Sequence, residues 1–171
     1  INSPQVNSGF NAFEILSDGR VVIGAYDKKV YVSANDGTSL TTLTESTAIV
    51  NVLMEDHNGD LLVGTSNGNL YRYNTDSWAV ETLSLAHGAS IVSLEEFDNS
   101  TYHIGTQGGK LTQVDVAGFS EGETYDSTGR VLGSKQEFTG EIYIVTSSAT
   151  SSKIRLYDLD TDGDGVTWVN P

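Results

Sequence analysis

The sequence predicts an all-β protein built as an array of four similar units. Three observations support this prediction. The 171 residues include 18 glycines but only 2 prolines. No segment shows a sustained helical period of apolar residues. Short apolar runs bounded by turn-forming residues recur about every forty residues along the chain. Many short strands joined by tight turns account for all three observations.

The clearest unit is a β-hairpin predicted in residues 58–73. Gly59 and Gly68 provide the positive φ angles that tight turns require, because neither residue has a Cβ. Between them, Leu61-Leu62-Val63 is a short apolar run that favours a buried strand. Residues 69–73 follow as a second strand rich in tyrosine, so the segment combines two strands and two turns.

The same hairpin recurs when the residue that follows each apolar strand is aligned. The aligned residues are Gly24, Gly64, Gly105 and Val145. Each hairpin has a further apolar segment on either side, which gives four short strands in about forty residues, the length and content of one β-propeller blade. We therefore predict a single propeller-like domain over residues 1–171, with repeats at approximately 9–46, 47–87, 88–128 and 129–171.

The repeat count leaves the size of the ring open. Four blades would close a small ring by themselves. Alternatively, they would form a half-ring that pairs with a second copy, or part of a larger ring. In each case neighbouring blades bury the faces that one sheet cannot bury alone, and the inner strands are covered on both sides. The glycines at positions 24, 64 and 105 let neighbouring strands approach closely near the axis.

Residues 55–73 resemble the repeat of two-component-regulator propellers. Here Glu55-Asp56 precedes a glycine turn, Gly64-Thr65 ends the apolar strand, and Leu70-Tyr71-Arg72-Tyr73 forms the strand after the second turn. The resemblance is good in the second repeat and fair in the first. It implies a blade fold and a binding or sensing role, and it assigns no catalytic residue.

The composition excludes several classes of function. The formal net charge is −14, and such a surface repels nucleic acid and anionic membranes. The absence of cysteine excludes disulfides and thiolate metal sites. No apolar run approaches the ~20 residues that span a bilayer, so membrane insertion is not expected.

An aspartate-rich segment near the C-terminus is the one candidate metal site. Asp158, Asp160, Asp162 and Asp164 alternate with other residues and are followed by Gly165. Alternating carboxylates before a glycine are able to wrap Ca²⁺, which takes six to eight oxygen ligands. The glutamate expected at the twelfth place of an EF-hand is missing, since that place is Pro171. The segment is therefore either a short Ca²⁺-binding hairpin loop or a solvated acidic turn.

We expect a non-catalytic binding or scaffold module that presents its loops to a protein or a glycan. No nucleophile motif or phosphate loop is present, and the histidines at 57, 87 and 103 lack the spacing of metal ligands. An extracellular or virion-surface protein fits the acidic, turn-rich composition, and it would form homo-oligomers or assemble with other structural proteins. The alternatives are a ligand-sensing domain of a signalling receptor and a carbohydrate-active propeller enzyme.

Overall fold

The computed structural model describes residues 8–34, 37–43, 46–126, 129–136, 142–147, 152–157 and 166–169. Its described residues form strands and turns, and the predicted all-β class is confirmed. Every four consecutive strands pair in chain order and antiparallel to form one sheet, which gives four four-stranded sheets, or blades. Among the described residues, no helix has the length and apolar character needed to cross a membrane.

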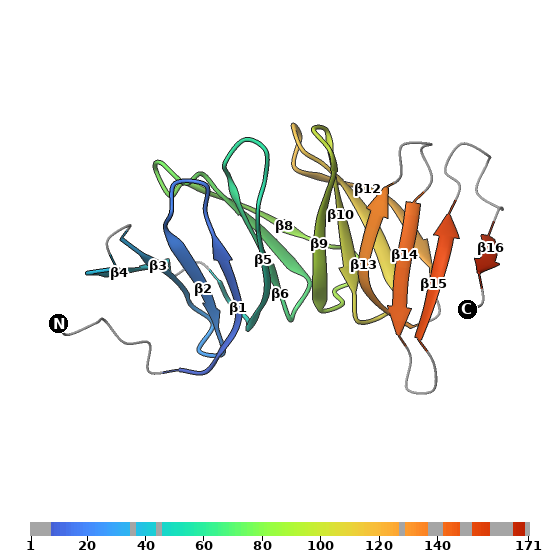
Figure 1. The fold of residues 1–171 in the computed structure, drawn as a ribbon, viewed down its shortest axis with the longest axis horizontal. Coiled ribbons are helices and arrows are strands. Elements are labelled where there is room, and N and C mark those ends of the chain that lie inside the picture. Colours follow the sequence, from blue (N-terminus) through green and yellow to red (C-terminus); the bar gives the residue numbers. More distant parts are fainter. Residues whose placement is uncertain are drawn as a thin grey trace. The chain divides into compact units, whose positions relative to one another are not determined.

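The strands follow the predicted four-strand repeat (Figure 1). Blade 1 comprises β1 (Phe10–Ile15), β2 (Val21–Ala25), β3 (Val30–Ser33) and β4 (Leu40–Leu43). Blade 2 comprises β5 (Val50–Glu55), β6 (Leu61–Thr65), β7 (Asn69–Tyr73) and β8 (Val80–Ser84). Blade 3 comprises β9 (Ile91–Asp98), β10 (Thr101–Thr106), β11 (Lys110–Asp115) and β12 (Ser120–Asp126). Blade 4 comprises β13 (Arg130–Gln136), β14 (Ile142–Ser147), β15 (Ser152–Tyr157) and β16 (Val166–Val169).

The hairpin that the sequence predicted most clearly is formed by β6 and β7. Their register pairs Leu61 with Tyr73 and Val63 with Tyr71. Gly59 and Gly68 have φ angles of 79° and 82°, so both turns use the left-handed conformation expected there. Every residue of β6 is buried, as expected for a strand covered on both faces.

The contacts divide the chain into two compact units, residues 1–91 and 92–171. In the first unit β1 and β5 lie side by side (Figure 1), and blades 1 and 2 share one hydrophobic core. The core residues up to Leu43 come from blade 1, and those from Val50 onward come from blade 2. The buried residues are Leu16, Val22, Val30, Val32, Leu43, Val50, Leu53, Leu61, Val63, Tyr71 and Tyr73.

The second unit contains blades 3 and 4, packed in the same manner. Val131 of β13 is fully buried and forms a core with Leu111 of β11, against which Phe97 and Tyr125 pack. The Cγ1 atom of Val131 is 2.7 Å from the position that a Cβ on Gly105 would occupy. A glycine on one blade therefore receives a β-branched side chain from the next blade within each unit.

Candidate binding surface

The turns of each blade lie at two opposite edges, because each blade is a simple meander. We call the edge with the turns after β1, β3, β5 and β7 the first rim, and the opposite edge the second rim. The strands themselves are committed to pairing and packing. Side chains that meet a partner are therefore expected on the rims.

Aspartate carboxylates close the turns of the first rim. Asp56 is buried, and its Oδ1 accepts hydrogen bonds of 2.9 Å from the amides of Asn58 and Asp60. Asp18 accepts a 2.9 Å bond from the amide of Arg20 and a 2.6 Å bond from its Nε. The bond from the Arg20 amide lowers the pKa of Asp18. These bonds fix the turn conformations by satisfying backbone donors that would otherwise be unpaired.

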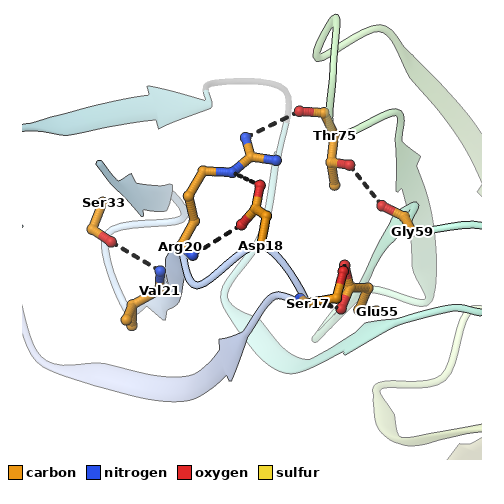
Figure 2. Close-up of polar contacts among 8 residues, drawn as sticks. All are labelled: Ser17, Asp18, Arg20, Val21, Ser33, Glu55, Gly59 and Thr75. Atoms are coloured by element: carbon orange, nitrogen blue, oxygen red, sulfur yellow. Dashed lines mark hydrogen bonds and ion pairs between the residues drawn. The ribbon is translucent and has the colours of Figure 1, made fainter. Parts of the chain in front are cut away.

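Polar contacts also join the first rims of blades 1 and 2 (Figure 2). The amide and hydroxyl of Ser17 donate to the two carboxylate oxygens of Glu55, at 2.7 and 2.9 Å. Arg20 Nη1 donates to the carbonyl of Thr75 at 3.0 Å, and the Thr75 hydroxyl donates to the carbonyl of Gly59 at 2.7 Å. The turns after β1, β5 and β7 are thereby held together as one surface.

The turn between β7 and β8 places a tryptophan in an unusual backbone conformation. Trp78 has φ = 58°, and its amide donates to the carbonyl of Asn74 at 2.7 Å. Its ring packs against the shared core of blades 1 and 2, and the guanidinium carbon of Arg20 lies 4.9 Å from the ring centroid. Packing and the cation–π contact therefore offset the strain of a bulky residue at positive φ.

The equivalent turn of blade 3 repeats this arrangement. Phe119 has φ = 42°, and the carboxylate of Asp115 accepts a hydrogen bond from the amide of Gly118, as the Asn74 side chain does from Ser77. Sequence reasoning missed both turns. The available signal was an Asn or Asp followed four residues later by an aromatic residue, at Asn74–Trp78 and Asp115–Phe119.

The charge that a partner would meet on the first rim of blades 1 and 2 is negative. Asp18 and Asp76 are exposed, and Asp60 is half-buried, with burial raising its pKa. The two arginines of these blades, Arg20 and Arg72, are largely buried and pair with Asp18 and Glu81. Among the described residues, no three His, Cys, Asp or Glu side chains converge on a common point. The acids are therefore spread along the rim.

On the second rim, side-chain hydrogen bonds link successive blades. The Tyr26 hydroxyl donates to Asn11 Oδ1 at 3.2 Å, and Asn11 Nδ2 donates to Asn51 Oδ1 at 3.1 Å. Asn51 Nδ2 in turn donates to the Ser90 hydroxyl at 2.8 Å and to the carbonyl of Ile91 at 3.0 Å. The two asparagines lie at the β-bulges of β1 and β5, forty residues apart. The forty-residue spacing of these asparagines is visible in the sequence, but only the fold shows that they hydrogen-bond to each other.

The predicted metal residues Asp158, Asp160, Asp162 and Asp164 lie outside the described residues. His103, which the sequence did not favour as a ligand, lies in the core of the second unit with 1 % of its surface exposed. Its ring centroid is 4.3 Å from that of Phe97, and burial lowers its pKa to about 4. The imidazole is therefore neutral at pH 7 and serves as a packing group.

Comparison with known proteins supports the fold. No family model matches this chain, and no curated protein matches its sequence. Among solved structures, the computationally designed Ika4 protein superposes with a TM-score of 0.73 at 17 % identity, covering 90 % of this chain and 93 % of that one. The structure of U3-55K superposes with a TM-score of 0.79 at 10 % identity, covering 97 % of this chain and 54 % of that one.

A chain of the Mitotic Checkpoint Complex also matches, with a TM-score of 0.73 at 18 % identity over 98 % of this chain and 52 % of that one. These neighbours and the four-stranded meanders define a β-propeller-like protein. At such low identities the similarity concerns the fold alone. The chain spans nearly all of the designed protein but only about half the length of the other two structures.

Proposed function

We propose that this chain is a non-catalytic binding module that presents its first rim to a protein partner with a basic contact surface. One observation carries the proposal: among the described residues, the exposed charges of this rim in blades 1 and 2 are carboxylates, on turns already held in place by hydrogen bonds. Preorganised turns lose little entropy on binding, and a uniform sign of charge steers an oppositely charged partner.

The proposed setting is the extracellular space or a virion surface, where the protein would act in attachment or decoration. The strongly acidic composition supports this setting, since a net charge of −14 favours solubility. A glycan is the second class of ligand that the sequence suggested. Trp78 lies on the first rim and is partly exposed, and an exposed aromatic face is able to stack on a sugar ring.

Calorimetric titration with a hexalysine peptide tests the proposal. The first-rim variant Asp76→Asn is compared with the control Asp27→Asn, which removes the same charge from the second rim of blade 1. We expect the peptide to bind the unmodified chain, to bind more weakly as salt is added, and to lose affinity several-fold only in the first-rim variant. Equal losses in both variants would show attraction by net charge alone and would overturn the proposed site.

A ligand-sensing domain of a signalling receptor is the second candidate, favoured by the resemblance of residues 55–73 to two-component-regulator repeats. In this segment Asp56 organises the first turn, and the Thr65 hydroxyl organises the second by donating to the carbonyl of Asn69 at 2.6 Å. This candidate requires further propeller repeats and a membrane span in the same polypeptide. The complete reading frame of the gene tests it, and a frame without either would exclude it.

A further inference from the structure

Two turns of blade 2 contain an asparagine followed by a glycine. Asn58-Gly59 lies in the turn between β5 and β6, and Asn67-Gly68 lies in the turn between β6 and β7. Such a pair is chemically reactive, because the glycine has no side chain to hinder attack of its backbone nitrogen on the asparagine side-chain carbonyl. Both asparagines are exposed, and both glycines have positive φ angles, of 79° and 82°. Sequence and turn conformation therefore do not distinguish the two pairs.

The side chain of Asn67 is held by hydrogen bonds. Its Oδ1 accepts from the Thr65 hydroxyl at 2.8 Å and from the Asn69 amide at 3.4 Å. Its Nδ2 donates to the Thr47 hydroxyl at 3.3 Å. The side chain would have to give up these bonds to reach the nitrogen of Gly68. They therefore protect Asn67 from cyclisation.

The backbone that follows Asn67 is packed as well. Gly68 is buried, and a Cβ placed on it would lie 2.8 Å from the carbonyl carbon of Gly88. Its amide donates to the carbonyl of Thr65 at 3.3 Å, and its carbonyl accepts from the amide of Leu85 at 3.1 Å. Because these contacts hold the turn against residues 85–88, its peptide group rotates less readily than that of an exposed turn.

Asn58 lacks both restraints. In the described part of the chain, no hydrogen bond involves its side chain. A Cβ placed on Gly59 would meet Glu55 Oε1 at 3.9 Å, which is an ordinary contact distance. The amide of Gly59 donates to the carbonyl of Asp56 at 2.9 Å, so this bond has to open before the nitrogen attacks. Opening of a single exposed turn is a local event that costs far less free energy than global unfolding.

We infer that Asn58 is a self-modification site of the folded chain and that it deamidates several-fold faster than Asn67. The nitrogen of Gly59 attacks Cγ of Asn58, and the new N–C bond closes a five-membered succinimide ring. The bond from Cγ to Nδ2 breaks, and ammonia leaves with the proton that the glycine amide gives up. Water then adds to one of the two ring carbonyls, and ring opening gives aspartate or isoaspartate.

Both products change the first rim. An aspartate at position 58 matches Asp18 in the equivalent turn of blade 1. Two places further on, however, blade 2 has Asp60 where blade 1 has the arginine that pairs with Asp18, so the new carboxylate has an acidic neighbour. An isoaspartate lengthens the backbone by one methylene and displaces the Gly59 carbonyl, which accepts a 2.7 Å hydrogen bond from the Thr75 hydroxyl. This inference is independent of the ligand proposed for the first rim.

Ageing of the full chain at mildly alkaline pH, followed by digestion and mass spectrometry, tests the inference. Endoproteinase Asp-N cleaves before aspartate and places Asn58 and Asn67 on separate peptides, residues 56–59 and 60–75. Deamidation is measured as the mass gained when NH₂ is exchanged for OH, and fragmentation locates the residue. We expect Asn58 to be converted several-fold faster than Asn67. Aspartate at position 58 creates a new cleavage site and isoaspartate does not, so the same digest separates the two products.

Two controls show whether the fold selects the site. Asn58→Gln is expected to abolish the gain in peptide 56–59, because glutamine would have to close a larger ring. In the chain unfolded by guanidinium chloride, Asn58 and Asn67 are expected to react at similar rates, since both precede a glycine. The inference would be overturned by an unchanged Asn58 in the aged chain, by equal rates for the two asparagines in the folded chain, or by the same preference for Asn58 after unfolding.

Discussion

The Cγ2 atom of Ile91 lies 2.6 Å from the point where a Cβ on Gly64 would stand. The glycine near the end of the second strand of a blade therefore leaves a space, and a β-branched side chain of a later strand fills it. Gly24 and Gly105 receive Val50 and Val131 in the same way. These contacts show how a forty-residue repeat in sequence becomes a repeat of packing, and they lead to the first prediction.

Replacing Gly64 by alanine is expected to destabilise the protein by about 1–3 kcal/mol, because the added methyl group would overlap Ile91 and Val52 in a packed core. Gly133→Ala is the matched control, since a Cβ there meets no atom within 4 Å. The control is expected to be neutral or slightly stabilising. Urea unfolding measures the free energy of unfolding of both variants. Equal stability of the two would show that close packing does not require a glycine at position 64.

Because burial lowers the pKa of His103, we predict that the protein loses stability in mild acid. Burial lowers its pKa in the folded state to about 4, whereas the unfolded chain has the ordinary value of about 6.5. The unfolded state therefore binds more protons between these values. Stability is complete above pH 6.5 and falls as the pH is lowered toward 4, by at most about 3 kcal/mol.

The free energy of unfolding of His103→Gln, measured by urea titration between pH 4 and 7, provides the comparison. Carboxylates also contribute to acid sensitivity, so the informative quantity is the difference between the two proteins. We expect the unmodified chain to lose more stability than the variant over this interval. Parallel pH profiles would show that the histidine does not carry the effect.

The hydrogen bonds from Ser17 to Glu55 predict an energetic coupling between blades 1 and 2. Glu55→Ala removes both hydrogen bonds, and Ser17→Ala removes the one from the hydroxyl. Because the contact is exposed, we expect a coupling of only about 0.5–1 kcal/mol in a double-mutant cycle. Glu14→Ala is the control for loss of a nearby carboxylate, and its effect should add to that of Ser17→Ala without coupling.

The contacts of Arg20 predict a second coupling between blades 1 and 2. Its guanidinium stacks on the ring of Trp78 and donates a hydrogen bond to the carbonyl of Thr75. Arg20→Gln removes the guanidinium from the tryptophan ring and from the Thr75 carbonyl. We expect a cost of about 1 kcal/mol, and a smaller cost when Trp78 has first been replaced by leucine. Thermal unfolding of the two single variants and the double variant measures this difference. Strictly additive effects would refute the stacking contribution.

Calcium binding by Asp158, Asp160, Asp162 and Asp164 stays a prediction. Titration calorimetry should detect Ca²⁺ binding that is lost in Asp160→Asn/Asp162→Asn, because these substitutions remove two of the charged ligands. Asp18→Asn/Asp76→Asn is the control for general charge reduction. The absence of heat at millimolar Ca²⁺ would exclude the site.

The sequence alone determined the strands, the glycine turns and their fourfold repetition. Turn glycines such as Gly59 and Gly68 act through the conformation of their own backbone, and an apolar run such as Leu61–Val63 predicts burial by its composition. These are local properties, so they can be predicted without knowledge of distant contacts. The glycine at the end of each second strand was recognised for the same reason, although the side chain that fills the space was not.

Only the tertiary structure decided which faces meet and which side chains join one blade to the next. The contacts of Ser17 with Glu55 and of Asn11 with Asn51 connect residues about forty positions apart, so no local pattern predicts them. The alternating pattern of β1 likewise shows that Phe13 belongs on an apolar face, but not whether that face is covered. Its exposure depends on the presence of a neighbouring blade, which is a property of the assembled fold.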